Sequence, residues 1–275
     1  MRLDVRSGFL FFAGLVAAQG QPSPEIVQKI VDVEKRLPWF WTPYPEGIRD
    51  VPYAYEYTVE NHTLNSKGEE VLPPKLKSGH YKHLRSIHLE HIPLKTGWGW
   101  TTRCIQQDGI ACMATEFDVP PTKDPDKFRA AREKRRLQRV ALWDEFLRAF
   151  HFDLTNQNHL HFTPTGTYKN RGVANADLFE KVAGELWFDP ATYEIYHMEF
   201  ELTADVGNFV TKLYKGTRFS IDLTKAIDDH YLPSMWSLKM NRRLLTSKGA
   251  AEGEVRYFNY RKFETSSTIT FADKE

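Results

Sequence analysis

The stretch from residue 184 to residue 202, GELWFDPATYEIYHMEFEL, decides the fold that we expect for this chain. Asp189 and Pro190 are typical of a turn, and the residues after them return as a strand. In that strand apolar and charged side chains alternate, and the apolar set is Tyr196, Met198, Phe200 and Leu202. Strict alternation indicates one buried face and one wet face, which is typical of an antiparallel sheet.

The same alternation recurs before and after this stretch. The further apolar positions are Tyr53, Tyr55, Tyr57, Val59, Leu160, Phe162, Phe219, Ile221, Leu223, Trp236, Leu238, Met240, Val255, Tyr257 and Phe263. Additional strands are expected at 80–92, 98–105 and 110–117, with a polar connector at 60–79. The pattern predicts a long β-meander that buries one face.

Two segments have helical periodicity instead. Residues 24–37 begin at Pro24 and carry apolar side chains at helical spacing up to Pro38. Residues 120–150 form a basic helical insertion, with eight Lys or Arg against three Asp or Glu between 123 and 139. This insertion is either a solvated helix or a basic lid that meets acidic lipid headgroups or an acidic partner. The lid candidates are Arg129, Arg132, Arg135, Arg136 and Arg139.

Residues 1–20, MRLDVRSGFLFFAGLVAAQG, have the layout of a secretory signal peptide. Arg2 and Arg6 form a basic lead, and the apolar run from Phe9 to Ala18 is too short to span a bilayer. The alternative is a buried N-terminal helix. The signal peptide predicts an exported, periplasmic protein in which residues 21–275 form one domain. No later segment is apolar for 18 residues, so no transmembrane segment is expected.

Composition narrows the range of functions. The 275 residues include 37 Lys or Arg and 36 Asp or Glu, and a chain with so little net charge is a poor general binder of nucleic acid. The hydrophobic share of 41% and the charged share of 27% exclude a disordered chain and a helical membrane protein. Aromatic residues reach 13%, so they cover a large core, line a cavity, or both.

Two cysteines, Cys104 and Cys112, flank the pair Asp108–Gly109, which is typical of a hairpin turn. A hairpin centred there would place the cysteines opposite each other on two strands. A disulfide fits an oxidising compartment, and two buried free thiols are the alternative.

We find no catalytic motif in the sequence. It has no Gly-x-Ser-x-Gly, no glycine-rich phosphate loop and no His-Glu-x-x-His. The histidines at 80, 83, 88, 91, 159 and 161 are the best metal ligands, but strand alternation distributes the first four over both faces of a sheet. We therefore expect no metal, no cofactor and no enzymatic activity.

The aromatic excess on the alternating strands leaves two alternatives open. These side chains are either plain core beneath a helix or the lining of a cavity that holds an apolar ligand between sheet and helix. The ligand-cavity candidates are Tyr53, Tyr55, Tyr57, Trp98, Trp100, Trp187, Tyr196, Met198 and Phe200.

Residues 158–263 resemble a bacterial family of secreted proteins related to the lipoprotein carriers LolA and LolB and to the sensor RseB. The resemblance rests mainly on the segment 184–190, GELWFDP, and on the charged alternating strand that continues through Glu201. Further matches are the segments 163–169, 215–217, 228–233 and 257–263. The resemblance implies an α+β fold, in which a curved antiparallel sheet forms an incomplete β-barrel with helices packed on its concave face.

In the carriers of this family the concave cavity holds lipoprotein acyl chains, so the resemblance implies a non-enzymatic carrier that binds lipid or an acylated protein in the cell envelope. The alternative is an envelope sensor or protein-interaction module with a filled core and no ligand. A third and weaker hypothesis is an envelope hydrolase, which would need a cleft with paired carboxylates or a metal site.

Overall fold

The structure, a computed structural model, describes residues 24–37, 51–65, 67–94, 99–112, 124–174, 176–207, 211–244 and 247–262. The expected signal peptide at residues 1–20 lies outside this range. Trp98, Phe263 and residues 113–117 of the strand expected at 110–117 lie outside it as well.

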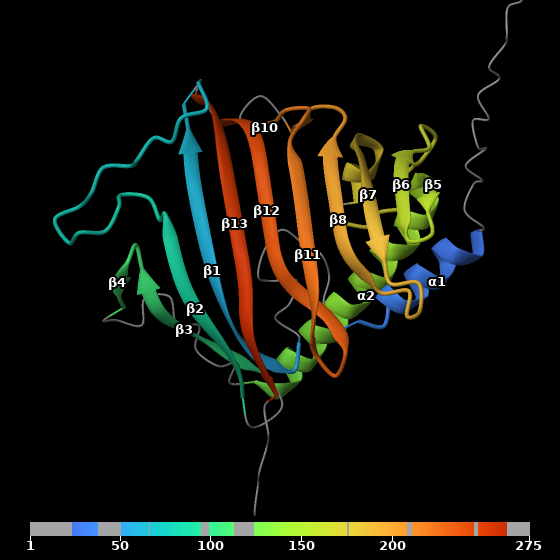
Figure 1. The fold of residues 1–275 in the computed structure, drawn as a ribbon, viewed down its shortest axis with the longest axis horizontal. Helices are drawn as coiled ribbons and strands as arrows, with labels where there is room; N and C mark the ends of the chain where they lie inside the picture. Colours follow the sequence, from blue (N-terminus) through green and yellow to red (C-terminus); the bar gives the residue numbers. More distant parts are fainter. Residues whose placement is uncertain are drawn as a thin grey trace, which may run out of the picture.

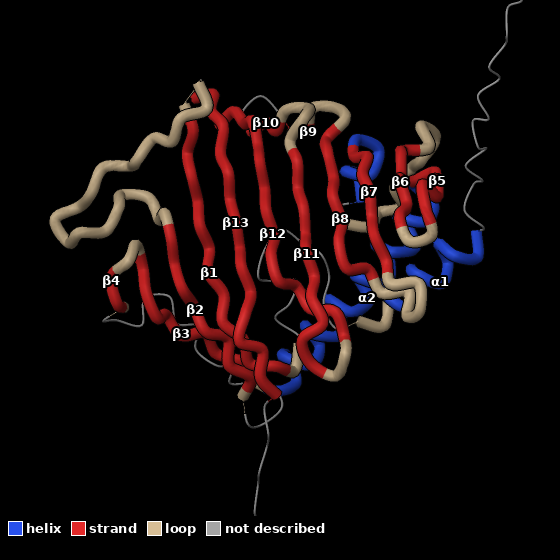
Figure 2. Tube along the Cα trace, viewed as in Figure 1, coloured by secondary structure: helices blue, strands red, loops and turns tan. Residues whose placement is uncertain are grey.

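One open antiparallel sheet contains all the described strands (Figures 1 and 2). Across the sheet the order is β4-β3-β2-β1-β13-β12-β11-β8-β7-β6-β5, and the short strands β9 and β10 extend from β12. The sheet is curved (Figure 1), and it does not close into a barrel because the strand order ends at β4 on one side and at β5 on the other. The predicted incomplete barrel of antiparallel strands is thereby confirmed. The strands are β1 (Tyr53–Leu64), β2 (Ser86–Pro93), β3 (Trp100–Gln107), β4 (Ile110–Ala111), β5 (Phe150–Asn156), β6 (His159–Pro164), β7 (Val182–Phe188), β8 (Ile195–Leu202), β9 (Val206–Gly207), β10 (Thr211–Leu213), β11 (Arg218–Ile227), β12 (His230–Leu244) and β13 (Ser247–Lys262).

Helices α1 (Pro24–Glu34) and α2 (Pro125–Ala149) lie on one side of this sheet, behind it in Figure 1. A short 3₁₀ helix, η2 (Ala176–Lys181), contacts α2. The Asp124 carboxylate caps α2, since it accepts the backbone N–H groups of Asp126 and Lys127, both at 3.1 Å. In α2 the buried residues all belong to the last two turns: Leu142, Trp143, Glu145, Phe146 and Ala149.

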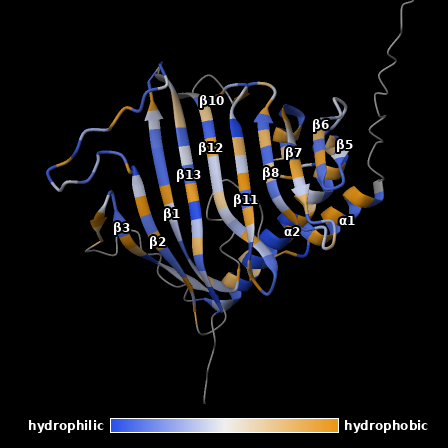
Figure 3. Ribbon diagram, in the orientation of Figure 1, coloured by the Kyte–Doolittle hydropathy of each residue, from blue (hydrophilic) through white to orange (hydrophobic). Residues whose placement is uncertain are grey.

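Hydrophobic and hydrophilic residues alternate along the strands (Figure 3), and the cross-strand register gathers them on two contrasting faces. We call the face toward the helices the inner face and the opposite one the outer face. On the inner face an apolar row is paired from strand to strand: Leu160, Leu186, Met198, Ile221, Trp236, Val255, Val59 and Ile87. On the outer face the neighbouring row contains His159, Trp187, His197, Asp222, Met235, Arg256, Thr58 and His88.

Gly184 in β7 has a packing role. A Cβ at this position would lie 2.0 Å from the carbonyl oxygen of Glu199 and 2.7 Å from Cζ of Phe162. The fully buried ring of Phe162 therefore occupies the space that a side chain at Gly184 would need.

A disulfide joins Cys104 to Cys112, so the disulfide alternative for these cysteines holds in the structure. The turn lies at Asp108–Gly109 as predicted, with φ angles of 49° and 83°. The pairing differs from the expected one by a residue, since the Cys112 N–H donates to the carbonyl of Ile105 rather than facing Cys104 directly.

Several predicted boundaries were wrong. β1 runs to Leu64, into the connector expected at 60–79, and α1 ends at Glu34 rather than at residue 37. The strand expected at 80–92 begins only at Ser86, and residues 80–85 belong to a long connection from β1. Phe150, assigned to the helical periodicity of 120–150, is the first residue of β5 and has an extended backbone.

Candidate interaction surfaces

The aromatic residues of β1 form a cluster with their neighbours on the inner face. The ring of Tyr55 lies 4.6 Å from that of His91 and 6.0 Å from that of Tyr257, between centroids. Tyr55 is 1% exposed, and Tyr57 is also buried. Burial raises the pKa values of the Tyr257 and Tyr260 hydroxyls above the ordinary value of a tyrosine, as expected in a dry interior. These aromatics are therefore part of the core.

Met198 and Phe200 belong to the inner face at the other end of the sheet. Met198 is 0% exposed, and Phe200 is half-buried with its ring 5.7 Å from that of Phe162. Phe146 of α2 reaches the same Phe162 ring at 5.2 Å. Side chains of the helix thus cover this part of the inner face.

Trp187 and Tyr196 do not join that inner-face group. The register pairs Trp187 with His159 and His197, and its ring stacks on that of His159 at 4.1 Å on the outer face. Tyr196 accepts a hydrogen bond from Asn158 at 2.9 Å and lies 6.0 Å from Tyr231, between ring centroids. The register shift between Trp187 and Phe188 leaves Tyr196 without a direct partner on β7, which removes it from the regular alternation.

The remaining cavity candidates lie near the first strands. Tyr53 is half-buried and packs against the core, and Trp100 has its ring 5.2 Å from that of His91. Trp100 is therefore a neighbour of the Tyr55 cluster, and Tyr53 lies at the edge of the core.

The outer face holds histidines that are already engaged with carboxylates. His159 Nε2 lies 3.0 Å from Glu185, and the two ring nitrogens of His197 lie 2.5 Å from Asp222 and 3.1 Å from Glu199. His88 Nε2 lies 2.8 Å from Glu56 in the same way. In the described part of the chain, no three His, Cys, Asp or Glu side chains are arranged to hold a metal ion.

Two buried carboxylates hold the helices in place, one on strand β8 and one on the connection that follows β6. Glu34 of α1 accepts the N–H of Ile195 at 3.0 Å, and burial raises its pKa to about 8 against the effect of this hydrogen bond. The Tyr168 hydroxyl donates to Glu145 of α2 at 2.5 Å, and Arg148 binds the other oxygen. Because both carboxylates are almost inaccessible, we assign them structural roles.

The first half of α2 carries the basic residues predicted as a lid. Arg129, Arg132 and Arg136 are exposed, whereas Arg135 and Arg139 are half-buried. Two of them pair with carboxylates on the same helix, Arg129 with Asp126 and Arg136 with Glu133, both at 2.7 Å. In sequence the described part, 124–139, holds seven basic and three acidic residues, so its net charge remains positive.

A loop between β1 and β2, described for residues 67–85, projects from the body of the protein (Figure 1). We call it the projecting loop. Short antiparallel bridges pair Leu64 with Glu70 and Lys75 with Tyr81. Near the tip the Leu76 N–H donates to the carbonyl of His80 at 2.8 Å. The loop therefore has a defined, hairpin-like backbone.

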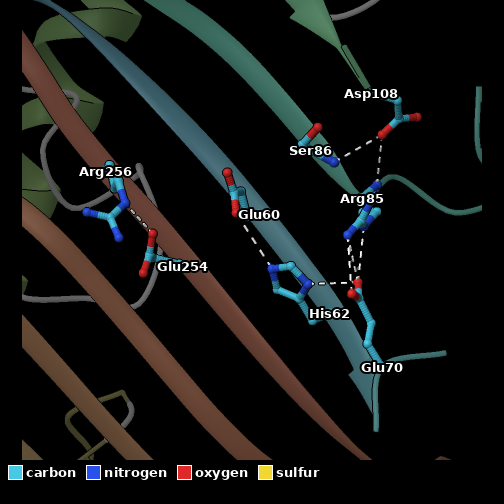
Figure 4. A network of polar contacts seen from close by, with 8 residues as sticks. All are labelled: Glu60, His62, Glu70, Arg85, Ser86, Asp108, Glu254 and Arg256. Atoms are coloured by element: carbon cyan, nitrogen blue, oxygen red, sulfur yellow. Dashed lines mark hydrogen bonds and ion pairs between the residues drawn. The ribbon is translucent and has the colours of Figure 1, made fainter. Parts of the chain in front are cut away.

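A polar network fixes the base of the projecting loop (Figure 4). Arg85 donates two hydrogen bonds to Glu70, at 3.1 and 3.2 Å, and His62 of β1 lies 2.9 Å from the same carboxylate. The hydrogen bond from His62 is the main cause that lowers the pKa of Glu70. Asp108 accepts the backbone N–H groups of Tyr81, Arg85 and Ser86, at 3.0 to 3.2 Å.

The projecting loop, which was expected to be a polar connector, exposes apolar side chains. Val71, Leu72 and Leu76 are 47%, 54% and 52% exposed. The sequence feature that could have revealed this exposed surface is the segment 71–77, VLPPKLK. Its three large aliphatic residues follow neither the regular spacing of a strand nor that of a helix.

No protein-family model matches this chain, and no curated protein matches it. Among solved structures, the chain is similar to the complex of Pseudomonas aeruginosa MucA/MucB, at 10% sequence identity and a TM-score of 0.22. The match covers 85% of this chain and 92% of that chain. None of the described helices is both long and apolar enough to cross a membrane. With so low an identity and TM-score, family and function have to be inferred from the residues of this chain.

Proposed function

We propose that the protein is a non-enzymatic, exported module of the bacterial cell envelope that binds a partner protein on its surface and carries no lipid inside its sheet. The observation that carries this proposal is the burial of the inner-face row from β6 to β13, where Leu160, Leu186, Met198, Ile221, Trp236 and Val255 are each at most 8% exposed. A side chain that lines a space wide enough for an acyl chain would keep part of its surface free of contact with other protein atoms. Tyr55 and Met198, at the two ends of the inner face, are 1% and 0% exposed.

The basic half of α2 is the surface that we assign to the partner. This half of the helix exposes Arg129, Arg132 and Arg136 to solvent, whereas the last two turns of α2 are packed in the core. A rigid helix anchored at one end holds these charges in place, which favours an acidic segment of a protein as partner. Arginine is also enriched at protein–protein interfaces, since its planar head forms paired hydrogen bonds with carboxylates.

The buried carboxylates give no support to an enzyme. Glu34 and Glu194 influence each other electrostatically, but both are buried and bind backbone N–H groups, of Ile195 and Tyr231 respectively. A substrate would have to displace α1 to reach Glu34. We therefore retain a binding role.

The test is site-specific photocrosslinking in the native envelope, with the crosslinker at Gln138 on the exposed part of α2 and, as control, at exposed Lys239 on β12. We expect a protein adduct at Gln138 and none at Lys239. The double variant Arg132→Glu, Lys134→Glu should abolish the adduct without changing the far-UV circular dichroism spectrum.

Lipid analysis of the protein purified from the same envelope separates this proposal from a carrier. We expect no stoichiometric lipid in the extract or by native mass spectrometry. One molecule of bound lipid per chain, released only on unfolding, would contradict the filled core and favour the carrier.

A further inference from the structure

We propose that the tip of the projecting loop, residues 71–82, inserts into the surface of an anionic lipid bilayer. This inference concerns a surface remote in sequence from the basic half of α2, and it does not depend on the function proposed above. Its first support is the concentration of exposed apolar side chains. Of the six large apolar residues that are exposed in the described part of the chain, three lie between Val71 and Leu76.

A fourth, Ile110 of β4, lies next to the tip. Its Cδ1 is 3.2 Å from the position that a Cβ would take on Gly79. Gly79 in turn donates its N–H to the carbonyl of Leu76 at 3.0 Å. The apolar surface therefore continues from the loop to the neighbouring hairpin, and single exposed aliphatic residues scattered at random would not produce this grouping.

The charge of the tip specifies what it can bind. From residue 71 to residue 82 the sequence holds three lysines, Lys75, Lys77 and Lys82, and neither Asp nor Glu. All three lysines are exposed. The nearest acidic residue of the loop, Glu70, is bound by Arg85 and His62 at the base. A surface that is both apolar and cationic matches the boundary between acyl chains and negative headgroups.

The shape of the loop favours a bilayer over a protein pocket. The tip projects outward (Figure 1), and its backbone is held by the Lys75–Tyr81 bridge and by the network at Asp108 and Glu70 (Figure 4). A protruding apolar tip would need a complementary pocket in a protein partner. A fluid interface admits such a tip without shape complementarity, while lysines at its sides contact phosphate groups.

Flotation with vesicles tests the inference. The exported full-length protein is mixed with vesicles of phosphatidylcholine alone or of phosphatidylcholine with phosphatidylglycerol. We expect binding to the anionic vesicles only. The double variant Leu72→Ser, Leu76→Ser should lower the partition coefficient about tenfold or more, from the lost apolar burial. Lys77→Glu should lower it about fivefold or more, and added salt should weaken the binding of the wild type.

The matched control is Leu137→Ser, Leu178→Ser, which removes the two exposed leucines that lie elsewhere, at 54% and 40% exposure. This control should bind the anionic vesicles as strongly as the wild type. Any contribution of the N-terminal residues to vesicle binding is the same in both proteins and cancels in the comparison. An environment-sensitive fluorophore attached through Leu76→Cys should shift to shorter emission wavelengths on anionic vesicles. Unchanged melting temperatures of all variants would show that binding, not folding, is altered.

Three results would overturn the inference. The first is a wild type that does not float with anionic vesicles. The second is equal flotation of the loop variants and the wild type. If flotation were then lost in the variant Arg132→Glu, Lys134→Glu, the lipid contact would belong to α2 instead. The third is a crosslinker at Leu76 that captures a protein, with no vesicle binding, which would assign the loop to a protein partner instead.

Discussion

The two ends of the sheet are covered by different kinds of side chain. At the β5–β8 end, helix α2 inserts Phe146 among Phe150, Phe162 and Phe179, with ring centroids 4.9 to 6.0 Å apart. At the β1–β3 end the inner-face cluster is made of tyrosines with His91 and Trp100. The first end has a closed hydrocarbon core under a helix. The second keeps polar groups among its rings and carries the disulfide hairpin and the projecting loop.

This difference implies that the two ends contribute differently to stability and to binding. A core made of phenylalanine against a helix gains almost entirely from apolar burial. The other end combines its buried tyrosines with a disulfide, and with ion pairs and hydrogen bonds near the surface that each contribute little. We therefore expect global stability to depend on the helical end, and local motion to be confined to the loop end.

The strongest test of this contrast is Phe146→Ala. Phe146 is 1% exposed and contacts four other phenylalanines, so its removal should lower the free energy of unfolding by about 3–5 kcal/mol. Urea denaturation followed by circular dichroism measures the change. The control Leu137→Ala, on the exposed part of the same helix, should change it by about 0.5 kcal/mol or less. Equal effects of the two substitutions would disprove the assigned core.

The second test uses the pH dependence that Glu34 confers on the helical end. Its pKa is raised from 4.5 to about 8 by burial, so between these pH values the folded state keeps a proton that the unfolded state loses. The contribution of Glu34 is therefore most favourable at low pH and declines as the pH rises toward 8. Glu34→Gln should remove this decline and stabilise the protein by on the order of a few kcal/mol above that range.

Chemical denaturation of wild type and Glu34→Gln across this pH range gives the difference directly. The substitution should leave the docking of α1 intact, since the amide oxygen of the new side chain is able to accept the N–H of Ile195. Parallel pH profiles for the two proteins would show that Glu34 is ionised in the folded state.

Among the interactions tested at the loop end, the disulfide should contribute most to the free energy of unfolding. Replacing both cysteines, Cys104→Ser with Cys112→Ser, should lower the free energy of unfolding by about 2 kcal/mol, because the bond closes a short loop in the unfolded chain. Reduction of the wild type should have the same effect. If the double variant lost as much as Phe146→Ala, the proposed contrast between the two ends would fail.

The sheet was predictable from the sequence because alternation of polar and apolar residues directly reflects its two faces. Met198 and Tyr257 were correctly expected on the apolar side of their strands, and the Asp108–Gly109 turn followed from local backbone preferences. The position of Trp187 was not predictable. Its face is fixed by the register that pairs it with His197, and a register depends on the turn and on bulges rather than on either strand alone.

The projecting loop could not be recognised for a related reason. Residues 80–85 look like the start of a strand, yet the carboxylate of Asp108, more than twenty positions later, binds the N–H groups of Tyr81 and Arg85 and holds them in a loop. Contacts between distant residues override local patterns here. The composition of 71–77 was visible, but only the structure shows that its leucines face solvent.

The smallest expected effect concerns this same Asp108. In Asp108→Asn one of the two acceptor oxygens becomes an N–H₂ donor, so at least one backbone N–H of the loop loses its partner. The free energy of global unfolding should fall by about 1 kcal/mol or less, while hydrogen exchange should accelerate selectively at Tyr81, Arg85 and Ser86. The matched control is Asp189→Asn at the helical end, where an aspartate also accepts a turn N–H, from Ala191 at 2.9 Å. That control should leave exchange in the projecting loop unchanged. Uniform acceleration throughout the sheet in Asp108→Asn would mean that the loop and the helical end unfold together, and the two ends would then have to be treated as one cooperative unit.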